Sequence, residues 1–263
     1  MDFSAGFETI ELPLIRLLYC RARTAYQASI RWRVPRVVPD IIRSFPHDTD
    51  AFTQGLVHQD GWLYESTGSD HASSIRRIDP HTGAIDQVVP VRDDFCEGIA
   101  FLGGRLFQVS YKSGRARIYS LPDLVHQSTE YYSGDAWGLA GDGQRLIMSD
   151  GTSVLRFFDQ ALNVIGKLRI TSNGIPVRQL NDIEFSSGRL FANLYGSTDV
   201  VEIDPASGRV TQFVDCVRLA SAAPANRSSA VMNGIAADRS TGTHFVTGKY
   251  WKTIFEIRIP PVR

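Results

Sequence analysis

One carboxylate, one ammonium group and three side-chain amides of this 263-residue chain could form a reactive site. They belong to Glu97, to Lys249, and to Gln54, Asn181 and Asn233. Apolar surroundings raise the pKa of a carboxyl group toward neutrality, so Glu97 could carry a proton between two groups. A lysine and an amide can stabilise an oxyanion that develops during a reaction. Because these residues span almost 200 positions, only the fold can bring them together.

A repeat of about 40 to 45 residues places these polar groups. Five turns, each followed by a short apolar strand, have glycine at Gly61, Gly104, Gly143, Gly188 and Gly242. The strand before each turn opens at Gln54, Glu97, Trp137, Asn181 or Asn233. Alternating third strands follow near 75–80, 116–120, 155–159, 200–205 and 254–258, and fourth strands follow the first four of these. This period predicts an all-β, five-bladed β-propeller of four-stranded antiparallel blades.

The fifth blade lacks a fourth strand, because the chain ends at Arg263. A three-stranded last blade would leave a long unpaired edge and an open ring. We therefore expect the apolar segment 37–43 to pair with 253–259 and close the ring. The propeller then forms one domain over residues 34–263. Residues 1–33 are expected to form a poorly ordered or loosely docked tail, with a membrane-surface amphipathic helix as the alternative.

First strands line the central channel of a propeller, and antiparallel pairing puts their beginnings on the same face as the ends of the second strands. We call this the site face. The second strands end there near Tyr111, Asp150, Tyr195 and Lys249. Aromatic walls with a few convergent polar groups are typical of a small-molecule pocket. The residues predicted to meet on this face include Glu97, Asn181 and Lys249 and, as candidates for binding a substrate, Phe52, Gln54, Phe95, Tyr111, Trp137 and Tyr195.

Composition argues against several classes of function. The 28 basic and 28 acidic residues give a net charge of zero, so nucleic acid is not an expected partner. No apolar run approaches the roughly 20 residues of a membrane span. Cys20, Cys96 and Cys216 have neither disulfide nor zinc-site spacing, and we expect no metal and no cofactor.

Eight short motifs, in register with all five blades, resemble the plant- and bacterial-type glutaminyl cyclases, also called glutamine cyclotransferases. They lie at 45–48, 51–56, 65–68, 97–98, 137–139, 180–184, 233–236 and 247–251. The resemblance runs from about residue 34 to 259. It implies a five-bladed propeller that cyclises the N-terminal glutamine of a peptide or protein to pyroglutamate and releases ammonia without a catalytic metal.

The resemblance also implies roles for individual residues. Glu97 matches the glutamate that transfers protons. Lys249 and Asn181 match groups that polarise the carboxamide oxygen, and Gln54 matches a residue that orients the substrate. Phe52, Phe95 and Trp137 match aromatic residues of the pocket wall. Tyr111 and Tyr195 stand where the plant enzymes have tryptophan, which affects substrate range and affinity more than the reaction.

Two other functions are compatible with a propeller. A non-catalytic propeller would use the aromatic residues to dock peptides or proteins. A lactonase-like hydrolase would bind a metal ion through Glu97, Asn181 and Asp150, although Lys249 argues against a divalent cation there.

Three further expectations concern the chain as a whole. The long insertion at 217–232 is interpreted as a flap over the site. We expect a monomer. We expect a cytoplasmic location, with export to the periplasm as the alternative, because residues 1–33 show no clear signal peptide.

Overall fold

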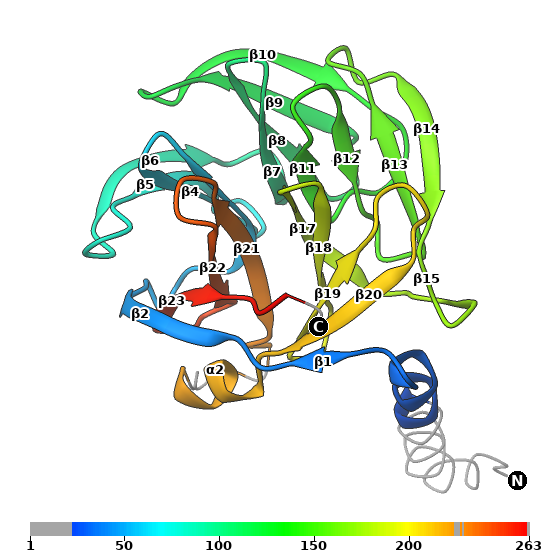
Figure 1. Ribbon diagram of the computed structural model, residues 1–263. Helices are drawn as coiled ribbons and strands as arrows, with labels where there is room; N and C mark the ends of the chain where they lie inside the picture. Colours follow the sequence, from blue (N-terminus) through cyan, green and yellow to red (C-terminus); the bar gives the residue numbers. More distant parts are fainter. Residues whose placement is uncertain (1–22, 224–226, 228, 262–263) are drawn as a thin grey trace, which may run out of the picture.

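The computed structural model describes residues 23–223, 227 and 229–261. Five small antiparallel sheets are arranged around a common centre, as Figure 1 shows. The innermost strands of successive sheets contact one another in a closed circle, and the last of them contacts the first. The predicted five-bladed β-propeller is therefore confirmed.

Each blade contains the strands that the repeat predicts. Blade one comprises β3 (Thr53–Gln59), β4 (Trp62–Thr67), β5 (Ser73–Ile78) and β6 (Ile85–Val91). Blade two comprises β7 (Cys96–Leu102), β8 (Arg105–Ser110), β9 (Arg115–Ser120) and β10 (Val125–Tyr131). Blade three comprises β11 (Leu139–Gly141), β12 (Leu146–Met148), β13 (Val154–Phe158) and β14 (Val164–Arg169). Blade four comprises β17 (Leu180–Ser186), β18 (Arg189–Leu194), β19 (Asp199–Ile203) and β20 (Val210–Asp215). Blade five begins with β21 (Met232–Asp238), β22 (Thr243–Gly248) and β23 (Thr253–Arg258).

The glycine turns join the first two strands of the blades. In blade one, Asp60 and Gly61 form a two-residue loop, and both have positive φ angles, of 52° and 80°. Such loops match the twist of a hairpin, but they place both residues in a region that favours glycine, asparagine and aspartate. The turn glycines are therefore a local signal of each hairpin.

The N-terminal segment closes the ring. Strand β2 (Asp40–Pro46) pairs antiparallel with β23, with Asp40 opposite Arg258 and Phe45 opposite Ile254, and Figure 1 shows the blue strand beside the red one. The predicted closure is confirmed, but the segment starts elsewhere. Strand β1 (Arg36–Val37) pairs parallel with β20 of blade four instead. Pro39 lies between the two strands and has no N–H group to donate, which interrupts the pairing where the chain passes from blade four to blade five.

Glycines allow the inner strands to approach one another closely. A Cβ atom on Gly98 would lie 2.5 Å from the backbone nitrogen of Leu139 in the next blade. One on Gly138 would lie 2.1 Å from the carbonyl oxygen of Asn181. Glycine directly after Glu97 and directly after Trp137 is thus required by packing at the propeller axis.

Residues 23–31 form a helix against blade four. Ile30 is fully buried in a core cluster that blades three and four share, and Arg31 pairs with the buried carboxylate of Asp199. This part of the expected tail is docked more closely than its composition suggested. Residues 1–22 lie outside the described part of the chain. The structure shows no helix, among the residues that it describes, that is long and apolar enough to cross a membrane.

Two smaller elements lie between blades. The hairpin of β15 (Thr171–Ser172) and β16 (Ile175–Pro176) connects blades three and four. The insertion before blade five begins with α2 (Val217–Ala222), whose Leu219 is buried in the core. Residues 224–226 and 228, on which the flap prediction also falls, lie outside the described residues.

Candidate active site

A cavity of about 420 Å³ opens on the site face of the propeller. Its lining comes from all five blades and consists of Phe52, Gln54, Asp70, Phe95, Glu97, Tyr111, Trp137, Asn181, Tyr195 and Lys249. The structure thus brings together Glu97, Asn181, Lys249 and the six residues predicted to bind substrate, although their roles stay predictions. Its volume is within the range of small-molecule sites.

Asp70 is the one lining residue that the sequence analysis missed. In blade one the position seven residues after the turn glycine is occupied by Gly68, which offers no side chain to the wall. Asp70 follows in the same connection between β4 and β5 and lines the cavity instead. Comparing the whole connection between second and third strands, rather than one position of it, would have found this carboxylate.

Three polar side chains form a hydrogen-bonded chain across the cavity floor. The Lys249 Nζ atom donates to Gln54 Oε1 at 2.6 Å, and Gln54 Nε2 donates to Glu97 Oε1 at 3.0 Å. The ammonium can only donate and the carboxylate can only accept, so the two charges determine the orientation of the Gln54 amide. Glu97 and Lys249 are each only 5% exposed. The site therefore contains two opposite charges that are almost removed from water.

Burial changes the acidity of both charged groups. It raises the pKa of Glu97 well above its usual range; Lys249 opposes this shift, and the Asp182 carboxylate adds to it. Burial also lowers the pKa of Lys249 to about 8, although Glu97 and Asp182 draw that pKa upward. Desolvation disfavours the charged form of each group, and here it outweighs their attraction. Proton transfer to and from Glu97 near neutral pH consequently becomes easier.

Aromatic side chains form the walls. The ring centroids of Phe52 and Phe95 are 6.1 Å apart, and those of Phe95 and Tyr111 are also 6.1 Å apart. Trp137 and Tyr195 meet edge to face at 5.7 Å on another part of the wall. These separations suit favourable aromatic pairs. Because the Lys249 Nζ atom lies 4.2 Å from the Phe52 ring centroid, the wall also stabilises the ammonium through a cation–π contact.

Asn181 and Asn233 begin equivalent strands but have different surroundings. Asn181 lines the cavity, and its side-chain amide has no hydrogen-bond partner among the described residues, so it can bind a ligand. Asn233 does not line the cavity, contrary to the expectation that it faces the site. Its Nδ2 atom donates to the carbonyl oxygens of Thr53 and Gln54, at 3.1 Å each. Asn233 therefore holds the strand that carries Gln54.

Asp182 joins three blades at the axis. Its Oδ2 atom accepts hydrogen bonds from the backbone N–H groups of Leu56 in blade one, at 3.3 Å, and Ile235 in blade five, at 2.9 Å. Burial raises the pKa of Asp182 well above its usual range, although these backbone hydrogen bonds oppose the shift. Asp182 does not line the cavity, so we assign it to the support of the site.

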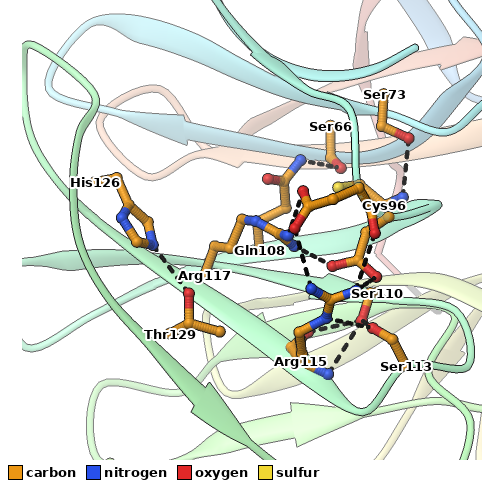
Figure 2. A network of polar contacts seen from close by, with 12 residues as sticks. Ser66, Ser73, Cys96, Gln108, Ser110, Ser113, Arg115, Arg117, His126 and Thr129 are labelled. Atoms are coloured by element: carbon orange, nitrogen blue, oxygen red, sulfur yellow. Dashed lines mark hydrogen bonds and ion pairs between the residues drawn. The ribbon is translucent and has the colours of Figure 1, made fainter. Parts of the chain in front are cut away.

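A cluster of two arginines and two aspartates holds the start of β7, which carries Glu97. Arg115 donates to Asp93 Oδ2 at 3.0 Å and to Asp94 Oδ1 at 2.9 Å, and Arg117 donates to Asp93 Oδ1 at 2.7 Å. Figure 2 shows both arginines beside the strand at Cys96. Asp94 directly precedes Phe95, so these charge-assisted bonds position a wall residue and the carboxylate together.

A buried histidine holds the turn that carries Lys249. The His47 Nδ1 atom lies 2.7 Å from the carbonyl oxygen of Trp251, and Nε2 lies 2.9 Å from Glu65 Oε1. Burial by itself lowers the pKa of His47, but the charge and hydrogen bond of Glu65 raise it above its usual value. This favours the imidazolium, which can donate from both nitrogens. The lysine of blade five is thereby tied to blade one.

Other candidate groups do not form a second reactive site. Among the residues that the structure describes, no three His, Cys, Asp or Glu side chains are grouped so that they could hold a metal ion. Asp150 does not line the cavity and instead accepts hydrogen bonds from the backbone N–H and the hydroxyl of Thr152. The three metal ligands considered for a lactonase-like hydrolase therefore do not line the same cavity. Burial raises the pKa of Cys96 to about 12, and Cys216 is also a buried free thiol. Cys20 lies outside the described residues.

A larger cleft, of about 930 Å³, lies between the outer strands of blade four, the hairpin at 171–176 and the linker at 33–35. Its charged lining residues are Arg33, Arg189, Glu202, Asp204 and Arg209. The cleft contains none of the predicted site residues and lacks aromatic walls. We therefore place the chemistry in the smaller cavity on the axis.

Three comparisons relate the chain to known proteins. A model of the glutamine cyclotransferase family matches residues 14–259. The glutaminyl-peptide cyclotransferase of Arabidopsis thaliana is 36% identical over 226 residues, which cover 84% of this chain and 71% of the plant protein. The crystal structure of Myxococcus xanthus glutaminyl cyclase matches with a TM-score of 0.83 and 35% identity, and the match covers 88% of this chain and 100% of the Myxococcus chain.

Proposed function

Because this chain belongs to the glutamine cyclotransferase family, we propose that it is a glutaminyl-peptide cyclotransferase. It would convert the N-terminal glutamine of a peptide or protein to pyroglutamate and release ammonia. The observation that carries the proposal is the hydrogen-bonded chain from Lys249 through Gln54 to Glu97 inside an aromatic cavity. Such a buried pair of charges is typical of a site for proton transfer rather than of a docking surface.

The reaction forms one bond and breaks another. The neutral α-amine of the substrate attacks the carbon of its own side-chain carboxamide, and a five-membered ring closes through a tetrahedral intermediate. The bond from this carbon to the carboxamide nitrogen then breaks. Glu97 takes a proton from the attacking amine and gives a proton to the leaving nitrogen, which departs as ammonia. A carboxyl group with a raised pKa suits both steps, because it acts first as base and then as acid.

Lys249 and Asn181 would stabilise the oxygen of the tetrahedral intermediate. An ammonium group has three donors, and only one of them is used by Gln54. The free amide of Asn181 adds a neutral donor. Removal of a single donor of this type typically lowers kcat by about 10²–10³-fold.

The aromatic walls would hold the glutamine side chain folded back on its own amine. Intramolecular attack becomes fast when the reacting atoms are kept about 3–3.5 Å apart. Rigid rings, braced against one another and against the backbone, can impose such a conformation. A Cβ atom on Gly151 would lie 2.7 Å from the Trp137 ring, which shows how closely the backbone supports this wall residue.

Ammonia release from Gln-Ala and from glutamine tert-butyl ester tests the function, and adding a chelator tests the proposed independence from metals. We expect ammonia release at the same rate with and without the chelator, because Glu97 is the proposed base and the Lys249 ammonium is the proposed cation. Loss of release with the chelator would contradict the metal-independent mechanism. Absence of release from any N-terminal glutamine would contradict the proposed function.

A further inference from the structure

The Asp70 carboxylate lines the cavity but has no role in the proposed reaction. It lies in the connection between β4 and β5 and is exposed. Two other carboxylates of the site face are paired, Asp48 with Arg76 at 2.8 Å and Asp50 with Arg227 at 2.6 Å. In the part of the chain that the structure describes, the Asp70 carboxylate has no ion-pair or hydrogen-bond partner. Its charge is available to a ligand.

The connection that carries Asp70 is braced against the reactive residues. The Ser73 hydroxyl donates to the carbonyl oxygen of Ser69 at 2.9 Å and accepts from the Ser69 N–H at 3.0 Å. The same hydroxyl accepts from the backbone N–H of Cys96 at 3.0 Å, a contact drawn in Figure 2. Gly68 donates to the carbonyl oxygen of Phe52 at 2.9 Å. The connection that carries Asp70 is therefore held close to Phe52 and to the strand that bears Glu97.

The charged residues of the cavity differ in how deeply they are buried. Glu97 and Lys249 are buried and carry opposite charges, whereas Asp70 is exposed and has no ion-pair partner among the described residues. A peptide must enter with its N-terminal glutamine first, because the amine and the carboxamide have to reach Glu97 and Lys249. The rest of the peptide then leaves through the mouth of the cavity, where Asp70 lies.

We propose that Asp70 forms a specificity subsite for the residue that follows the N-terminal glutamine, favouring lysine or arginine there and disfavouring aspartate or glutamate. This inference rests on the proposed cyclotransferase function. An exposed ion pair changes kcat/KM by about two- to five-fold, and a like charge has a similar effect of opposite sign. The preference should weaken as salt screens the exposed charges.

Three peptides that differ only in the second residue test the subsite: Gln-Lys-Ala, Gln-Ala-Ala and Gln-Glu-Ala amides. We expect kcat/KM, measured by ammonia release with the full chain, to fall in that order for the wild type. Asp70→Asn should reduce the spread between the peptides, and Asp70→Lys should reverse the order. The matched control is Asp135→Asn, which changes an exposed aspartate of the site face that does not line the cavity and should keep the wild-type order.

The outcomes separate the subsite from the function. Equal values for the three wild-type peptides, or an order unchanged in Asp70→Lys, would overturn the subsite while the cyclotransferase activity stands. An equal loss for all three peptides in Asp70→Asn would overturn it as well, since Asp70 would then act on the common glutamine. If no peptide releases ammonia with the wild-type protein, the proposed function fails and the subsite with it.

Discussion

Replacing Glu97 by glutamine separates the chemical role of this residue from its structural role. The substitution keeps the shape of the side chain, and its amide oxygen can still accept the 3.0 Å hydrogen bond from Gln54. It removes the group that accepts and returns the proton. General acid–base catalysis typically contributes 10²–10⁴-fold, so turnover should fall by about that factor, which corresponds to about 3–5 kcal/mol of activation free energy.

The same substitution should not destabilise the protein at neutral pH. Glu97 has a raised pKa in the folded state, so the folded protein binds more protons than the unfolded chain at pH values between about 4.5 and the folded pKa. In this window Glu97 ionises in the unfolded chain but keeps its proton in the folded protein. The free energy of unfolding of the wild type therefore falls as pH rises. Glutamine does not ionise, and the stability of Glu97→Gln relative to the wild type should increase from pH 4 to pH 7.

Glu184 provides a matched control for both measurements. It is also a buried glutamate, 5% exposed, and burial raises its pKa to about 8, but it does not line the cavity. Glu184→Gln should show the same direction of stability change in urea unfolding and near wild-type ammonia release. Turnover of Glu97→Gln within tenfold of the wild type would refute the proton-transfer role, and an equal loss in both variants would refute the assignment of this role to Glu97.

Two further predictions concern Lys249 and ring closure. Because the pKa of Lys249 is about 8, kcat/KM should fall above that pH. Lys249→Arg should shift this fall to higher pH and lower the maximum value of kcat/KM. If the fall occurs at the same pH in Lys249→Arg, the ammonium group of Lys249 does not take part in the mechanism. Deleting residues 40–46 removes strand β2 and its pairing with β23 and opens the ring, so we expect the single cooperative urea transition to be lost. A truncated chain that unfolds as sharply as the full chain would show that closure does not depend on this segment.

Much of the fold and of the site was predictable because the relevant signals are local. A two-residue turn such as Asp60–Gly61 and the alternation of a strand depend on neighbouring residues only. Once the repeat places Glu97 and Asn181 at equivalent starts of first strands, their common face follows from the geometry of a blade. The partner strand for blade five was likewise predictable, because every other edge was already assigned.

Contacts between residues that are distant in the sequence determined which side chains face the cavity. Asn181 and Asn233 occupy equivalent positions, but only Asn233 meets the carbonyl oxygens of blade one, so only Asn181 remains free for a ligand. A Cβ atom on Gly68 would lie 2.5 Å from the Phe95 ring, so a side chain does not fit there, and Asp70 lines the wall from further along the same connection. Repeat position and strand alternation are properties of the chain itself. The direction of a side chain and the identity of its partner depend on packing between blades, and only the closed propeller determines them.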